Sequence, residues 1–496
     1  MYSHWIRCLG LNIGVIMTSP VQQKIKSLAT SALGLLASIN RKRLPKLTAG
    51  NPYLTGLNRP MTEEKTIESL AVSGTIPTAL NGRYLRIGPN PLIEPDAKSH
   101  HWFLGDGMAH GVRVKDGAAL WYRNRWVRSA AISKTLGELP TPGSDHPRAG
   151  SPNTNIIGID GRTFAIVEAG GMPVELDDGL DMIKHNAFDD TLDGSFTAHP
   201  HFDPATGEYH AICYDTAKSR NTVWHVVLDD KAQVIRREPI AVTDGPSIHD
   251  CAITENYVLV FDLPVTFSMK SVLAGHRFPY KWNSNHRARV GLCPRNGSGK
   301  DTLWCDVDPC YVFHPANAYE TADGTVIVDV VAHETMFARS AIGPDSKRAR
   351  LERWTIDSAT QSVVRKVLHD HNQEFPRFNE AYSCKPYRYT YSVALAMDVE
   401  DEILAKPGTQ LFKYDLQTDS VQVRDFGANR HPGEFVFVAA EEATAEDAGW
   451  LMGFVVDAEN QNTDLVILNA VDICEEPEAS IHIPHCIPGG FHGNWV

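Results

Sequence analysis

The feature that most restricts the fold of this chain is a long series of short apolar runs separated by polar turns. Typical runs are "GRYLRIG", "TFAIVEA", "YVLVFDL", "TVIVDVVA" and "DLVILNA", all of them after residue 66. Their length and their content of β-branched and aromatic residues predict β-strands. Helical periodicity is scarce in the same part of the chain, so the pattern argues against alternating strands and helices around a parallel sheet.

The joins between these runs share a turn chemistry. "DPATGEYH", "IDSATQSV" and "YDLQTDSV" each place an Asp and a Thr or Gly between two extended segments, which favours tight hairpins. Many hairpins in series predict a closed all-β array, and we expect a seven-bladed β-propeller with roughly 60 residues in each blade. Three longer segments, 130–150, 265–290 and 370–382, are expected to form a helical and loop dome over one face.

Composition limits the class of protein further. The chain has 496 residues, 43% of them hydrophobic, and a formal net charge of -13, which argues against a nucleic-acid partner. Its nine cysteines are scattered, odd in number and without a C-x-x-C pair. This pattern is not typical of a disulfide framework or a zinc ribbon, and it favours a reducing, cytoplasmic location. With no apolar run of about 18 residues, no transmembrane helix is expected.

The N-terminal part differs from the rest, and we expect an extension over residues 1–50 followed by a single propeller domain over 51–496. Within the extension, residues 22–46 place apolar side chains at helical spacing and basic side chains towards both ends. A basic amphipathic helix on an acidic protein predicts peripheral attachment to a membrane surface. The alternative is a helix that packs on the body of the protein.

Histidine is the residue type that stands out, with 21 copies, whereas nucleotide-binding and G-x-S-x-G motifs are absent. Four histidines lie where a turn or small-residue segment meets a β-like run: His199 in "TAHPHFDP", His249 in "PSIHDCAIT", His314 in "YVFHPANAYE" and His492 in "GGFHGNWV". The last of these is close to the chain end, where most chains fray. Its apolar, glycine-rich surroundings suggest burial, which a bound metal ion would explain.

These contexts resemble the carotenoid cleavage oxygenase family. "LNGRYLRIGPNP", "HWFLGDGMAHGVRV", "YRNRWVRS" and "NTNII" are similar to the N-terminal half of that family, and "EFPRFNE", "GEFVFVA" and "GFHGNW" to its C-terminal half. The resemblance extends from residue 51 to the end of the chain. It implies a seven-bladed propeller with a dome over the face that carries a metal site.

The resemblance also implies the composition of that site. It places Fe(II) between His199, His249, His314 and His492, and three supporting glutamates at Glu168, Glu374 and Glu434. Imidazole suits Fe(II), and a carboxylate on the other ring nitrogen fixes the tautomer and the orientation of a ligating histidine. The alternative for the glutamates is a place on the surface or in local ion pairs. No catalytic residue is implied beyond this metal site.

The stretch "TAHPHFDP" contains a second histidine, His201, which shares a strand face with His199 if the segment is extended. The family match places the ligand at His199. We therefore expect His201 to be a neighbour that lines or supports the site.

The reaction implied by the resemblance is oxidative cleavage of a conjugated C=C bond of a carotenoid or apocarotenoid by O₂, giving two carbonyl products. The alkene supplies the electrons, in agreement with the missing nucleotide motifs. A hydrophobic polyene requires a long apolar tunnel, and the aromatic residues expected to line it are Trp102, Phe103, Phe267, Phe278, Tyr280 and Trp282.

Three alternatives stay open at this point: cleavage of a stilbene or phenylpropene, isomerisation without cleavage, and a propeller that binds a partner without catalysis. For phenol-cleaving relatives, the resemblance implies that a lysine near the "RWV" strand and a tyrosine hold the phenol oxygen. Here Arg128 follows "RWV" and Lys134 lies a little beyond, so the sequence does not decide between a carotenoid and a phenolic substrate.

Overall fold

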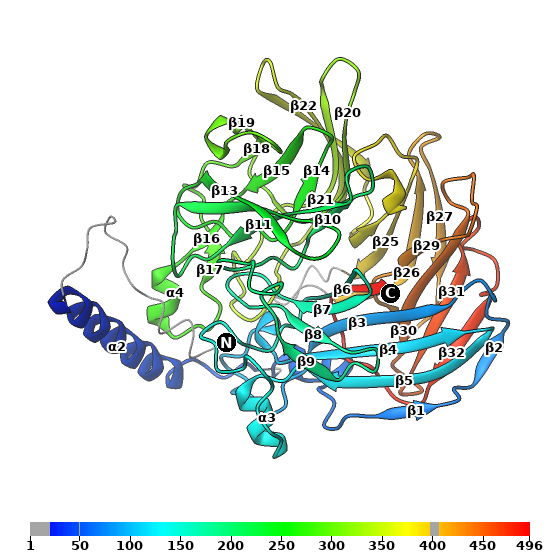
Figure 1. Cartoon of the computed structure of the whole chain (residues 1–496), viewed down its shortest axis with the longest axis horizontal. Coiled ribbons are helices and arrows are strands. Elements are labelled where there is room, and N and C mark those ends of the chain that lie inside the picture. Colours follow the sequence, from blue (N-terminus) through cyan, green and yellow to red (C-terminus); the bar gives the residue numbers. More distant parts are fainter. Residues whose placement is uncertain (1–19, 49, 397–405) are drawn as a thin grey trace.

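The computed structural model describes residues 20–48, 50–396 and 406–496. These residues form seven antiparallel β-sheets that surround a common centre (Figure 1). The inner strands of neighbouring sheets contact each other around this centre. The predicted seven-bladed β-propeller is therefore confirmed.

Each blade pairs its strands from the central axis outwards. In the first blade they are β33 (Gly493–Trp495), β3 (Gly82–Pro89), β4 (Gly107–Lys115), β5 (Ala118–Trp126) and β1 (Thr66–Glu68). The second blade has β6 (Asn155–Ile159), β7 (Arg162–Ile166), β8 (Val174–Leu176) and β9 (Met182–His185), and the third has β10 (His201–Asp203), β11 (Glu208–Tyr214), β12 (Thr222–Leu228) and β13 (Val234–Ala241). The fourth has β14 (Cys251–Ile253), β15 (Tyr257–Asp262), β18 (Arg289–Pro294) and β19 (Leu303–Asp306), and the fifth has β20 (Tyr311–Glu320), β21 (Val326–His333), β22 (Ala349–Asp357) and β23 (Ser362–His369). The sixth has β24 (Gln373–Arg377), β25 (Tyr389–Ala396), β26 (Lys406–Asp415) and β27 (Ser420–Asp425), and the seventh has β28 (Arg430–Pro432) and β29 (Val436–Ala439), both on β30 (Gly449–Asp457), then β31 (Asn462–Asn469), β32 (Ala479–Ile483) and β2 (Val72–Gly74).

Strands from both ends of the chain close the ring. The C-terminal strand β33 pairs with β3, and the early strand β2 pairs with β32 as the outer strand of the last blade. At the first of these joints a Cβ on Gly493 would lie 2.4 Å from the carbonyl oxygen of Leu85, so only glycine allows the two strands to approach this closely.

The hairpin joins form as the turn chemistry predicts. Asp203, Asp357 and Asp415 each accept a backbone N–H two residues further on, at 2.9, 2.8 and 3.1 Å. Such Asx turns provide the backbone with a local acceptor where the strand pairing ends. The hairpins expected from "DPATGEYH", "IDSATQSV" and "YDLQTDSV" are thus confirmed.

Two of the three predicted long insertions contribute to a cover over one end of the ring. The first contains α3 (Ala130–Leu136), and the second contains the hairpin β16 (Val265–Phe267) and β17 (Tyr280–Trp282) with α4 (Met269–Ala274) between its strands. The expectation for 370–382 was wrong, because this segment contains β24, a propeller strand. It resembled a loop in the sequence because the strand is short and contains Pro376.

The N-terminal helix α2 extends over Pro20–Lys42, so it ends four residues before the predicted boundary. Its C-terminal part packs on α4, where Asn40 donates to the carbonyl of Leu273 at 2.7 Å (Figure 1). Leu35, Leu36 and Ile39 remain exposed on the same helix. In the described part of the chain, no helix combines the length and apolarity needed to cross a membrane, and the eight described cysteines form no disulfide.

Candidate metal centre

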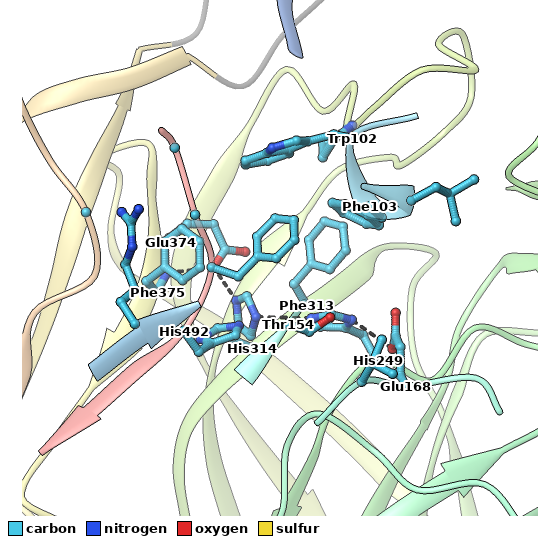
Figure 2. Close-up of a pocket in the computed structure, with 18 of the residues that line it drawn as sticks. Trp102, Phe103, Thr154, Glu168, His249, Phe313, His314, Glu374, Phe375 and His492 are labelled. Atoms are coloured by element: carbon cyan, nitrogen blue, oxygen red, sulfur yellow. Dashed lines mark hydrogen bonds and ion pairs between the residues drawn. The ribbon is translucent and has the colours of Figure 1, made fainter. Parts of the chain in front are cut away.

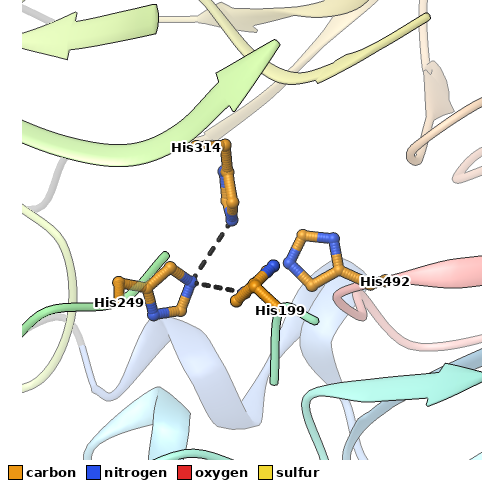
Figure 3. Close-up of side chains that lie close together, drawn as sticks. All are labelled: His199, His249, His314 and His492. Atoms are coloured by element: carbon orange, nitrogen blue, oxygen red, sulfur yellow. Dashed lines mark hydrogen bonds between the residues drawn. The ribbon is translucent and has the colours of Figure 1, made fainter. Parts of the chain in front are cut away.

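The four histidines singled out from the sequence come together at the centre of the ring (Figure 3). His199 and His249 lie two residues before β10 and β14 of blades three and four, His314 lies in β20, and His492 directly precedes β33. One ring nitrogen from each histidine lies within 4.8 Å of those of the other three, and all four side chains are buried.

The three predicted glutamates come from the remaining blades. Glu168 follows β7 of the second blade, Glu374 lies in β24 of the sixth, and Glu434 lies between β28 and β29 of the seventh. Each blade therefore contributes one histidine or one glutamate to the centre, which explains why these residues are so far apart in the sequence.

Each glutamate accepts the Nδ1–H of one histidine. The Nδ1–oxygen distances are 3.0 Å for His249 with Glu168, 2.6 Å for His314 with Glu374 and 3.0 Å for His492 with Glu434. Burial raises the pKa of Glu434, but the nearby His492 and Arg377 outweigh this effect and bring that pKa down to about 2. The carboxylate is therefore ionised and suited to hold its histidine in one tautomer.

The four histidines and their carboxylate partners form a site that suits a cation. Because Nδ1 donates to a carboxylate, the Nε2 atoms of His249 and His314 present lone pairs, and these two atoms lie only 3.3 Å apart. The Nε2 atoms of His199 and His249 are 3.1 Å apart. Burial, together with the neighbouring histidines, also lowers the pKa of His199 well below its ordinary value, which disfavours protonation as a means of relieving this repulsion. Imidazole nitrogens that converge in this way are a donor set for a divalent transition metal.

The fourth histidine has a different partner, which the sequence analysis missed. Asp250 Oδ2 lies 3.6 Å from His199 Nδ1, and the other oxygen of Asp250 lies 2.7 Å from His201 Nε2. His201 is thus linked to the site through Asp250, as a neighbour rather than one of the four converging histidines. The available signal was the position of Asp250, directly after His249 in "SIHDC".

A second partner of Glu374 was also missed. His333, at the end of β21, lies with its Nε2 2.6 Å from Glu374 Oε1, so this glutamate bridges two histidines. His333 is buried. Its sequence context, "VVAHET", is that of an ordinary core strand and does not mark His333 as a site residue.

An apolar cavity reaches the centre from the side of the dome (Figure 2). Four of the six aromatic residues expected to line it do so, namely Trp102, Phe103, Phe278 and Tyr280. The expectation was wrong for Phe267 and Trp282, which pack against the hydrophobic core instead.

Four further aromatic residues line this cavity: Tyr214, and three that are each next to a site residue in the chain. Phe313 precedes His314, Phe375 follows Glu374, and Phe491 precedes His492. Neighbours on a regular strand point to opposite faces. The register of β20 and of β24 shifts at these positions, which lets adjacent side chains reach the same space.

A second, polar cavity reaches the centre from another direction. It is lined by residues of the inner strands β6, β10, β20, β24 and β33, so it lies along the axis of the propeller. His314 and His492 border both cavities, His249 borders only the apolar one, and His199 only the polar one.

Neither cation that the phenolic alternative requires borders the apolar cavity. Arg128 forms ion pairs with Glu64 and Glu138, at 2.9 and 2.8 Å from its Nη2. Lys134 is exposed on α3. Neither Arg128 nor Lys134 is therefore placed to hold a phenol oxygen in this cavity.

These features define a class: a β-propeller metalloprotein whose four-histidine centre opens into an apolar pocket. Comparison of the sequence with known protein families identifies the family. The model of the RPE65 family, described as retinal pigment epithelial membrane protein, matches residues 58–496, and the chain belongs to this family.

The relatives of this chain include named oxygenases. A carotenoid cleavage oxygenase of Mycobacterium tuberculosis (strain ATCC 25618 / H37Rv) is 41% identical over 492 residues, which cover 90% of this chain and 97% of the relative. Carotenoid 9,10(9',10')-cleavage dioxygenase 1 of Arabidopsis thaliana is 30% identical and covers 95% of this chain and 94% of its own length. The structure of cobalt-substituted Synechocystis apocarotenoid oxygenase matches with a TM-score of 0.77 and 26% identity, over 88% of this chain and 97% of that chain.

Proposed function

We propose that this protein is a non-haem Fe(II) dioxygenase that cleaves a conjugated C=C bond of a carotenoid or apocarotenoid with O₂ and releases two carbonyl products. The observation that carries this proposal is the convergence of one ring nitrogen from each of four histidines, three of which border the inner end of an aromatic cavity. A long polyene fits an apolar cavity, and three of the four histidines border this cavity where the double bonds would pass.

In this proposal His199, His249, His314 and His492 hold the iron, and Glu168, Glu374 and Glu434 fix three of them. Four ligands leave positions free on an ion that prefers six. When bound, ferrous iron supplies the redox chemistry that allows O₂ to react with an alkene. Both oxygen atoms enter the products and the alkene provides all the electrons, so no nicotinamide, flavin or oxo-acid is needed.

In this proposal the other residues of the site position the substrate and exclude water. Phe103 lies against Phe313 and Phe491, with ring centroids 6.0 and 5.5 Å apart. This aromatic wall holds the polyene in one register over the centre and keeps bulk water away, which is how a binding site selects one bond among similar ones. No side chain is required to move a proton.

The test is product analysis with the Fe(II)-reconstituted protein. We expect aldehyde or ketone fragments from a panel of carotenoids and apocarotenoids by mass spectrometry, with label from ¹⁸O₂ in both fragments. Cleavage restricted to stilbenes or phenylpropenes would overturn the substrate class. Retention of an isomerised, uncleaved polyene would overturn the reaction.

Metal identity needs its own measurement. We expect about one equivalent of iron per chain by elemental analysis after anaerobic loading, and loss of O₂ uptake after chelation. A zinc-filled protein without O₂ uptake on any polyene would indicate a binding protein with a structural metal.

We also propose that the protein is a cytoplasmic enzyme and that its N-terminal extension, residues 1–50, attaches it peripherally to the membrane that holds its substrate. Leu35, Leu36 and Ile39 are exposed on α2, and Lys42 and Lys46 are exposed near its end. Apolar side chains beside basic ones suit an anionic bilayer surface.

Deletion of residues 1–46 tests the attachment. We expect the deletion to reduce co-sedimentation with anionic liposomes and to leave cleavage of detergent-solubilised substrate unchanged. A triple Leu35→Ser, Leu36→Ser, Ile39→Ser variant keeps the charges and separates the apolar contribution. Unchanged sedimentation of both variants would contradict the proposal.

A further inference from the structure

We propose that the polar cavity along the propeller axis is the route by which a divalent metal ion enters, and that His201 and Asp250 bind the ion on the way to the four histidines. This inference rests on the proposed metal centre. It assigns a transient binding site to a pair of residues that are not among the four converging histidines.

The two cavities that meet at the centre differ in charge. The polar cavity is bordered by Asp250, Glu380, Glu434 and Arg377, three carboxylates and one guanidinium, an excess of two negative charges. A cleft with charge of one sign attracts counter-ions and raises their rate of association. A divalent cation is therefore drawn into this cavity.

The apolar cavity offers no such attraction. Its two carboxylates, Glu168 and Glu374, are matched by two guanidinium groups, Arg86 and Arg148. An ion that enters from that side must also leave water to pass aromatic rings, and desolvation of a charge in apolar surroundings is costly.

The polar cavity also presents metal-binding groups in order of increasing burial. The Glu380 side chain is 56% exposed, that of His201 is 22% exposed and that of Asp250 is 4% exposed. The carboxylate of Asp250 then lies 3.6 Å from His199 Nδ1. These groups form a continuous path from solvent to the back of one of the four converging histidines.

The geometry of the pair suits a divalent ion. His201 Nε2 and Asp250 Oδ1 are 2.7 Å apart, and together with Cys251 these residues place one ligand atom each within 4.8 Å of one another. His201 and Asp250 border the cavity, whereas Cys251 does not. An imidazole and a carboxylate with room for water molecules would bind an ion weakly, as a residue on an entry path should.

A purely structural role for His201 is the competing explanation. In that case its bond to Asp250 serves only to aim the other carboxylate oxygen at His199. Such a role would change the final metal affinity and the ligand field of the centre, whereas a role in entry would change only the rate of loading.

The experiment follows metal uptake by the full-length apoprotein, with Co²⁺ as the probe because its coordination is visible by absorption. In stopped-flow mixing at low ionic strength, His201→Ala should slow uptake by about tenfold. The final stoichiometry and the Co²⁺ spectrum should equal those of the wild type. Phe103→Leu, on the apolar side, is the matched control and should load at the wild-type rate.

A second variant keeps the proposal open to refutation if His201→Ala is unstable. Glu380→Gln changes an exposed residue at the outer end of the path, and it should slow uptake by about two- to threefold and weaken its salt dependence. Unchanged uptake in both variants would overturn the route, as would slower uptake accompanied by an altered Co²⁺ spectrum. If the wild type itself bound no Co²⁺, the proposed metal centre would fail before the route was tested.

Discussion

The two cavities share His314 and His492 yet are built from different parts of the molecule. The apolar one is bordered by segments 148–150 and 278–280 of the dome, by loops and strand ends of several blades and by aromatic residues beside the site, and the polar one mainly by inner strands of five blades. The ring thus holds the four histidines and their polar approach, whereas the dome contributes to the wall of the apolar approach. Changes on the two sides should therefore affect different properties of the enzyme.

The largest expected effect separates two histidines of one short stretch. His199→Ala removes one of the four converging nitrogens and should abolish metal retention and nearly all activity. His201→Ala removes a residue of the polar side and should retain the full metal content at equilibrium. Elemental analysis after gel filtration and O₂ uptake provide the measurements. The reverse pattern would show that the ligand in "TAHPHFDP" has been assigned wrongly.

A smaller effect is expected at the carboxylates that hold the histidines. Glu374→Gln weakens the acceptor for both His314 and His333, and loss of such a partner typically costs about 10–100-fold in metal affinity or activity. Asp250→Asn should cost less than this, because its contact with His199 is longer, at 3.6 Å. Metal titration with a competing chelator measures both. Equal losses would indicate that the two sides support the centre equally.

The smallest expected effect concerns the walls of the two cavities. Phe103→Ala should raise KM for a polyene by about tenfold, equivalent to about 1.4 kcal/mol, because it removes an aromatic contact without touching a ligand. Tyr209→Phe, on the polar side, should leave KM unchanged. Steady-state kinetics with detergent-solubilised substrate decides between these outcomes. A similar change of KM in both variants would mean that substrate occupies both cavities.

The residues that could be predicted from the sequence are those whose local motif carries the information. The hairpin turns follow from Asp at fixed positions, and the histidines and glutamates from short motifs that resemble those of a known family. Strand β24 was missed because local propensity at Pro376 argues against a strand, although the ring requires an inner strand there.

The partners of the site residues could not be predicted in the same way. His333 of the fifth blade contacts Glu374 of the sixth, and a register shift in β20 directs the Phe313 side chain towards the centre. Both depend on how neighbouring sheets pack, which no single segment encodes. Asp250 is intermediate, because its position beside His249 was visible but its contact with His201 was not.

The closure of the ring by β33 has a consequence for protein synthesis. His492 stands at the junction to this last strand, so three of the four converging histidines emerge from the ribosome before the fourth. A nascent chain therefore has no complete centre while the segment with His492 is still in the exit tunnel. The four-histidine centre is therefore complete only after β33 has been synthesised and has paired with β3.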